Sequence, residues 1–342
     1  MPSRCPVAVG AVAGAILRRV VLSVLVCAAV VSAPASAQQQ SPLAGPNDAK
    51  SSRWQAEVDR LDDAFRARLI IANDPRSNWV AGQLDRGDIE SQVSHFAMAR
   101  VAAPRNMLYL ATLATACMEI TQPRLPECEA VDRLADWATR DTYNGWPSLL
   151  LADRARQHRT PDAMLAHLQS AAAQPRFVEY WEKGSLDIWE AVRAMPIAGE
   201  EAAKLELAVI YAMPRSLTWT NAARATCNGN AERPEAVRGA CAQLGAAMRS
   251  RGSTWMARLI GGRLVRANVD SAEAKTAADQ ALEAIRTQIA ACARATGQIL
   301  DGLEAADAAA RAKAVAEWDR WLRREAELGE ARACEERVAA AK

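Results

Sequence analysis

Apolar residues recur at intervals of three and four along most of the chain, with charged residues between them. The stretch from Asn144 to Pro175 holds two such runs. Their members are Trp146, Leu149, Leu150 and Ala152 in the first run, and Ala163, Met164, Leu168, Ala171 and Ala172 in the second. This spacing places each run on one face of an α-helix. Asn144 and the pair Thr160-Pro161 are typical helix starts, so the stretch predicts two helices joined by a tight turn.

A helical hairpin of this kind cannot bury its apolar faces alone, so it needs neighbours stacked against it. The rest of the chain supplies them, since no window shows sustained alternation of β-branched residues. The predicted fold is therefore all-α, built from stacked helical hairpins without a sheet. The other helices are expected over 89–102, 106–118, 128–139, 200–213, 217–226, 234–249, 253–267, 305–327 and 331–340, with a long one opening at 270 and others beginning near 54 and 180.

The hairpin resembles a tetratricopeptide-type (TPR-like) repeat, whose pattern has Trp, Leu and small residues on one helix, then Ala, a bulky residue, Ala and Pro. The matching positions here are Trp146, Leu149, Ala152, Ala163, Leu168, Ala171 and Pro175. Two features depart from the pattern: the turn is one residue longer, and Leu150 stands where a small residue is usual. The resemblance covers about one 34-residue repeat. It implies an α-solenoid that acts as a scaffold for a protein or peptide partner.

The N-terminus has the layout of a secretory signal peptide. Arg18 and Arg19 precede an apolar run over 20–31, and Ala35-Ser36-Ala37 is a small-x-small cleavage site. We expect cleavage after Ala37 and a periplasmic or secreted mature protein without a membrane span. An uncleaved membrane anchor is the alternative, and the choice between the general and the twin-arginine export route stays open.

The composition divides the remaining chain into four parts. Residues 38–52 are polar and rich in Ser, Pro and Gly, which predicts a flexible linker. We expect an N-terminal helical cap over 53–103, TPR-like hairpins over 104–196 and a C-terminal helical region over 197–342.

The charge balance excludes two classes of partner. The chain has 42 Lys and Arg against 40 Asp and Glu. Without the three arginines of the signal region, 39 basic residues face 40 acidic ones, a net charge of −1. A near-neutral protein gives no electrostatic reason to bind nucleic acid or an anionic membrane surface.

Six cysteines remain after the signal region, and an even number in an exported chain predicts disulfides. Partners that flank a loop between two helices can approach to the short Cα–Cα distance that a disulfide requires. We therefore expect Cys117 to pair with Cys128 and Cys227 with Cys241. Cys292 with Cys334 is the pair left over.

Nothing in the sequence matches a catalytic or metal-binding motif. The three histidines lack ligand-spaced partners, and neither HExxH nor G-x-S-x-G occurs. No cofactor is expected. Gly261-Gly262 favours close packing between helices over a phosphate loop, because no strand precedes the pair and no Lys-Ser/Thr follows. Acidic residues are abundant, so a cell-envelope hydrolase of the peptidoglycan type, with an unrecognised carboxylate pair, is the alternative to a non-catalytic scaffold.

The candidate binding residues are aromatic. The chain has ten Trp against four Tyr and three Phe, and several lie between 137 and 189. Trp favours interfaces as well as cores, because its N–H needs a partner. Adjacent residues on a helix point about 100° apart, so Tyr180 and Trp181 cannot both face one core. We expect Tyr180 and Trp181, with Trp146, to floor a groove between the hairpin 144–173 and the helix that follows it. The ligand would be a peptide, a protein or a cell-envelope component.

Overall fold

The computed structural model describes residues 48–85, 88–120, 125–129, 131–212, 218–228, 233–303, 305 and 307–340. Sixteen helices and no strand are found in these residues, which confirms the predicted all-α fold. The first eight are α2 (Asp48–Ala72), α3 (Pro75–Leu84), α4 (Ile89–Ala102), α5 (Met107–Glu119), α6 (Pro126–Glu129), α7 (Arg133–Arg140), α8 (Gly145–Gln157) and α9 (Pro161–Ala173). The others are α10 (Trp181–Ala194), α11 (Glu201–Ala212), α12 (Thr218–Cys227), α13 (Glu235–Arg251), α14 (Trp255–Asn268), α15 (Ala272–Leu303), α16 (Ala308–Leu328) and α17 (Glu330–Ala340).

The expected signal peptide, with its cleavage site after Ala37, lies outside the described residues. So does most of the expected linker. Helix α2 begins at Asp48, so residues 48–52 are helical.

Polar side chains begin many of these helices, as the sequence indicates. Asp74 accepts hydrogen bonds from the backbone N–H groups of Arg76 and Ser77, and Pro75 occupies the first turn of α3. Asn144 accepts from the N–H of Trp146 at the start of α8. Such caps satisfy N–H groups that have no partner within the helix.

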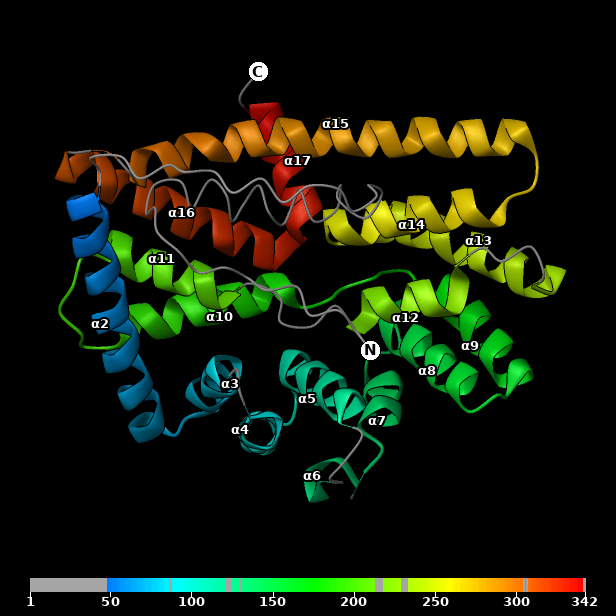
Figure 1. The fold of residues 1–342 in the computed structure, drawn as a ribbon, viewed down its shortest axis with the longest axis horizontal. Helices are drawn as coiled ribbons and strands as arrows, with labels where there is room; N and C mark the ends of the chain where they lie inside the picture. Colours follow the sequence, from blue (N-terminus) through cyan, green and yellow to red (C-terminus); the bar gives the residue numbers. More distant parts are fainter. Residues whose placement is uncertain are drawn as a thin grey trace.

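Neighbouring helices pair as hairpins, but the hairpins are not stacked in a single line in sequence order. Helices α3 to α9 form an arc along the lower part of Figure 1, with α8 packed on α9. Helices α10 and α11 then return to the beginning of the chain, where α11 packs on α2 and α10 packs on α3. Helix α15 crosses the top of the view from α14 to α16 (Figure 1). The predicted division into 53–103, 104–196 and 197–342 stays a prediction.

Glycines let helices α13 and α14 approach each other closely. A Cβ atom on Gly261 would lie 2.5 Å from the carbonyl oxygen of Gly245 and 2.5 Å from the backbone nitrogen of Arg249. A Cβ atom on Gly262 would lie 2.6 Å from Leu282 Cδ2 on α15. The prediction that Gly261-Gly262 marks close packing between helices is therefore confirmed.

All three predicted cysteine pairs lie at bonding distance. The Cα atoms are 5.5 Å apart in Cys117–Cys128, 5.4 Å in Cys227–Cys241 and 5.6 Å in Cys292–Cys334. The first pair staples α5 to α6 and the second α12 to α13, whereas the third ties α17 to the long helix α15. Each local cross-link contributes about 3 kcal/mol by the loop-entropy argument.

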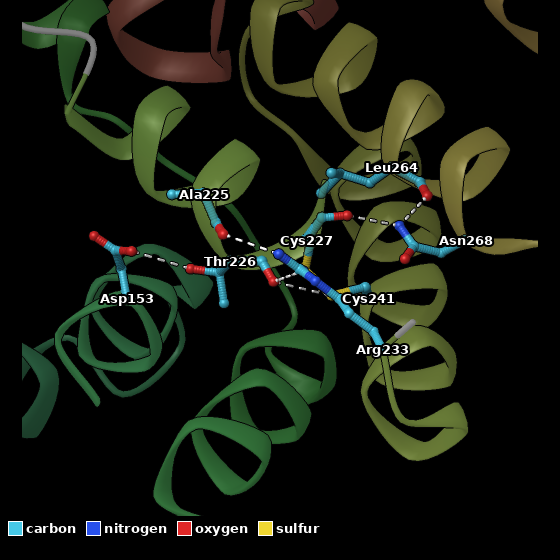
Figure 2. Close-up of a disulfide and its surroundings, with 8 residues drawn as sticks. All are labelled: Asp153, Ala225, Thr226, Cys227, Arg233, Cys241, Leu264 and Asn268. Carbon is cyan, nitrogen blue, oxygen red and sulfur yellow. Dashed lines mark hydrogen bonds between the residues drawn. A yellow bond between two sulfur atoms is a disulfide. The ribbon is translucent and has the colours of Figure 1, made fainter. Parts of the chain in front are cut away.

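The second disulfide lies at the C-terminal end of α12, where other side chains satisfy the last carbonyl groups (Figure 2). Arg233 donates to the backbone oxygens of Ala225 and Thr226. Asn268 donates to the backbone oxygen of Cys227 at 2.9 Å. The helix end is thereby closed by α14 and by the segment that precedes α13.

Candidate functional site

The segment between α9 and α10, residues 174–180, joins several helices of the molecule. It is extended, and its backbone bonds to two other connections. Arg176 accepts from the N–H of Gly145 at 2.9 Å, ahead of α8. Phe177 donates to the oxygen of Arg251 at 3.2 Å and accepts from the N–H of Ser253 at 2.9 Å, between α13 and α14. Buried backbone groups need such partners, so this segment holds α8, α10 and the α13–α14 pair together.

The carboxylate of Asp141 fixes the same segment from the other side. It is almost fully buried and accepts four side-chain hydrogen bonds. The donors are Trp137 Nε1 at 3.2 Å, Asn144 Nδ2 at 2.9 Å, a terminal guanidinium nitrogen of Arg176 at 2.9 Å and Tyr180 Oη at 2.6 Å. A buried charge with this many donors is well compensated. Tyr180 reaches it from a left-handed backbone conformation, with φ of 62°.

The predicted binding residues are brought to this region but not into one surface. Trp146 and Tyr180 are buried, whereas Trp181 is half-buried at the first position of α10. The Tyr180 hydroxyl is occupied by Asp141, and burial together with this carboxylate raises its pKa. Tyr180 therefore holds its segment against Asp141 and is not available to a ligand. Of the two adjacent aromatic residues expected to line a groove, only Trp181 reaches solvent.

The expected position of the groove is also corrected. The hairpin α8–α9 packs on α12 and α13, whereas α10 turns away to pack on α11, α3 and α16. The helix that follows the hairpin in sequence is thus not its main neighbour in space. What packs on Trp146 is instead Trp219 of α12.

Trp146, Trp219 and Phe177 form an aromatic cluster at the α8–α12 contact. The ring centroids of Trp146 and Trp219 are 4.7 Å apart, and Phe177 meets Trp146 edge-on at 5.5 Å. Trp146 is 1% exposed, yet its indole N–H has no hydrogen-bond acceptor among the residues that the structure describes. Trp219 is half-buried, so the cluster reaches solvent through that ring. Trp219 was not among the residues predicted from sequence, because no periodic feature separates it from other tryptophans.

A second group of side chains gathers four glutamates beside α10. Glu179 accepts from the hydroxyls of Ser253 at 2.9 Å and Thr254 at 3.0 Å. Glu182 accepts from the backbone N–H of Glu330, and Glu330 accepts from the backbone N–H of Trp255. Glu182 and Glu330 therefore each cap the beginning of another helix, α17 and α14 respectively. Glu325, near the end of α16, completes the group, named here the acid cluster.

The acid cluster is short of positive charge. Burial raises the pKa of all four carboxyl groups, and the charge of Glu182 raises the pKa of Glu179, Glu325 and Glu330 further. The pKa of Glu330 reaches about 7, although the N–H of Trp255 and the charge of Arg258 oppose the shift. Desolvation and like charge both disfavour an ionised carboxylate. At mildly acidic pH Glu330 is therefore largely protonated.

No sequence pattern indicates the acid cluster, since its members lie in four places: the segment 174–180 and helices α10, α16 and α17. Within the described part of the chain, no set of three or more His, Cys, Asp or Glu side chains is arranged to hold a metal ion. The same part contains no helix that is both long and apolar enough to cross a membrane.

Comparisons with known proteins give no match: no family model, curated protein or solved structure matches this chain. The structure defines the protein as an all-α assembly of packed helical hairpins. The TPR-like resemblance thus depends on the residues of the α8–α9 hairpin alone.

Proposed function

We propose that this protein is an exported helical scaffold that binds a peptide, a protein or a cell-envelope component through the Trp146–Trp219–Phe177 cluster. The observation that carries the proposal is the indole N–H of Trp146, which is buried without an acceptor against the half-buried ring of Trp219. A buried donor left unpaired costs about 1–3 kcal/mol. A ligand that supplies a carbonyl or hydroxyl oxygen would recover this cost, and Trp219 offers it an aromatic surface.

Two other buried tryptophans, Trp255 and Trp318, also lack an acceptor. Trp146 differs because a half-buried aromatic ring packs directly on it, so a ligand that stacked on Trp219 would lie next to the N–H. The export part of the proposal is supported by three cysteine pairs at bonding distance, since disulfides persist in oxidising compartments.

Two probes test the binding proposal: purified peptidoglycan sacculi in co-sedimentation, and a random peptide library displayed on phage. We expect the mature protein to be retained by one of them. Trp219→Ala should weaken retention about tenfold or more, whereas Trp219→Phe, which keeps an aromatic ring on Trp146, should retain most of it. Ile71→Ala, at an exposed position on α2, is the control and should bind like the wild type. Equal retention of the Trp219→Ala variant, at an unchanged melting temperature, would contradict the proposed site.

The alternative function is a cell-envelope hydrolase that uses the acid cluster. It is favoured by the raised pKa of Glu330, because a carboxyl group protonated near neutral pH is a property of general acids. The hydrogen bonds of Glu179, Glu182 and Glu330 to the protein itself favour the scaffold instead. Release of soluble fragments from sacculi by the wild type, and its loss in Glu182→Gln, would establish the hydrolase and overturn the scaffold.

A further inference from the structure

We propose that the acid cluster is a pH-operated latch, which holds the corner between α16 and α17 on α10 and α14 while its carboxyl groups are protonated and releases that corner when they ionise. The corner comprises residues 325–333. This inference concerns regulation of the fold, and it does not depend on the proposed binding function.

The corner is held by contacts that pass through or beside the acid cluster. The N–H of Glu330 donates to Glu182 on α10 at 3.2 Å, and Glu330 accepts from Trp255 on α14 at 3.0 Å. The N–H of Ala331 donates to the backbone oxygen of Ser253 at 2.9 Å. Gly329 has φ of 85°, and a Cβ atom there would lie 2.9 Å from Ser253 Cβ. The corner is thus pressed against the start of α14, and the glutamates occupy that contact.

The charged groups of the surrounding elements do not neutralise the cluster by ion pairs. On α10, Lys183 is exposed and lies over the ring of Tyr180. On α14, Arg258 pairs with Glu335 of α17 at 2.6 Å. On α16 and α17, Arg324 pairs with Glu327 and Glu336. The other charged positions of these two helices outside the cluster are Arg311, Lys313, Glu317, Asp319, Arg320, Arg323, Arg332, Glu335 and Arg337.

The remaining charges belong to the other elements at this contact. Asp187, Glu190 and Arg193 lie further along α10, where Arg193 pairs with Asp319. Arg176, in the connecting segment, is bonded to Asp141. Arg263 and Arg266 on α14 lie beyond Arg258, and Arg249 and Arg251 end α13. Among the described residues, none of the four glutamates of the cluster forms an ion pair at 4.0 Å or less with a basic side chain.

Protonation therefore decides whether the contact is attractive or repulsive. Neutral carboxyl groups accept and donate hydrogen bonds at close range without net charge. Ionised carboxylates in a poorly solvated site repel one another strongly. Burial and the charge of Glu182 raise the pKa of Glu179 to about 8 and that of Glu330 to about 7, which places the ionisation of these two groups near neutral pH. The corner 325–333 is accordingly held on α10 and α14 in mild acid, and repulsion between carboxylates weakens this contact in mild alkali.

The Cys292–Cys334 disulfide makes the release local. It ties α17 to α15 four residues after Glu330, so the corner can leave α10 and α14 while the helix stays attached to the protein. Contact segments of this kind open with a smaller free energy than the whole fold.

Hydrogen exchange of the full mature chain at pH 5.5 and 8.5, corrected for intrinsic rates, tests the latch. Peptides covering 325–333 and 253–258 should lose about tenfold or more of their protection at pH 8.5, while peptides of the α8–α9 hairpin should keep theirs. Glu182→Gln, which keeps the acceptor for Glu330 N–H but removes the central charge, should abolish this difference. Glu327→Gln, an exposed acid on α16, is the matched control and should behave like the wild type.

Equal protection of the corner at both pH values in the wild type would overturn the proposal. So would a Glu182→Gln variant that retained the full pH dependence. If that variant fails to fold, Glu325→Gln replaces it, since it removes a charge from the cluster without touching either helix cap, and the same two outcomes apply.

Discussion

The carboxylate of Glu182 accepts a hydrogen bond from the backbone N–H of Glu330 across 148 residues of sequence. This contact begins α17 with a side chain from α10, and it places two acidic residues together. An acidic side chain at a helix N-terminus is stabilised by the helix dipole, whereas a second buried carboxylate beside it is not. The balance between these two effects gives the protein its expected dependence on pH.

We expect the melting temperature to fall as the pH rises from 5.5 to 8.5. The pKa of Glu330 is raised from 4.5 to about 7 on folding, so the folded state binds more protons than the unfolded state within this range. Stability is then lost as the pH rises, by about 2 kcal/mol for this group between pH 5.5 and 8.5. Scanning calorimetry of the wild type and of Glu182→Gln measures the effect.

The comparison with Glu182→Gln is needed because His167 changes the pH dependence of the stability in the opposite direction to Glu330. Burial lowers the pKa of His167, so its contribution to stability grows as the pH rises. The variant should lose most of the fall in melting temperature. A wild type whose melting temperature rises steadily to pH 8.5 would refute this prediction.

Asp141→Ala should destabilise the protein by about 3–5 kcal/mol. The substitution leaves Trp137, Asn144, Arg176 and Tyr180 without their common acceptor. Tyr180→Phe removes one of those donors and should cost about 1–2 kcal/mol. Urea denaturation followed by circular dichroism measures both. Similar losses for the two variants would mean that Asp141 does not organise the group.

Gly261→Ala should destabilise the protein by about 1–3 kcal/mol, because the added methyl group would overlap the backbone of α13. Gly297→Ala on α15 is the matched control, since a Cβ atom there meets no atom within 4 Å. It should stabilise by up to about 1 kcal/mol through helix propensity. Thermal unfolding of the two variants should move in opposite directions. A stabilised Gly261→Ala would show that the two helices separate easily.

Trp181→Ala should destabilise less than Trp189→Ala. Both residues lie on α10, but Trp189 is fully buried whereas Trp181 is half-buried. Truncating a buried Trp costs about 3–5 kcal/mol. Thermal unfolding compares the two. An equal or larger loss in Trp181→Ala would make Trp181 a packing residue and contradict its prediction as a ligand-binding residue.

The sequence by itself determined the local features of this protein. Periodic apolar positions and caps such as Asp74 and Asn144 indicate the helices, because these signals lie within a few residues of one another. The local cysteine pairs follow from the same short range. Gly261-Gly262 indicates a close helix contact without indicating its partner.

Only the tertiary structure decided which helices meet. The hairpin α8–α9 packs on α12 and α13, so Trp219 of α12 lies against Trp146. Helix α10, which begins with Trp181, packs on α11, α3 and α16 instead. Likewise, Glu182 and Glu330 read as ordinary solvated acids in the sequence. The burial of Glu182, the half-buried position of Glu330 and their raised pKa values arise from the return of α16 and α17 onto α10 and α14. Such contacts depend on the surfaces of whole helices, and a periodic pattern specifies an apolar face without specifying what covers it.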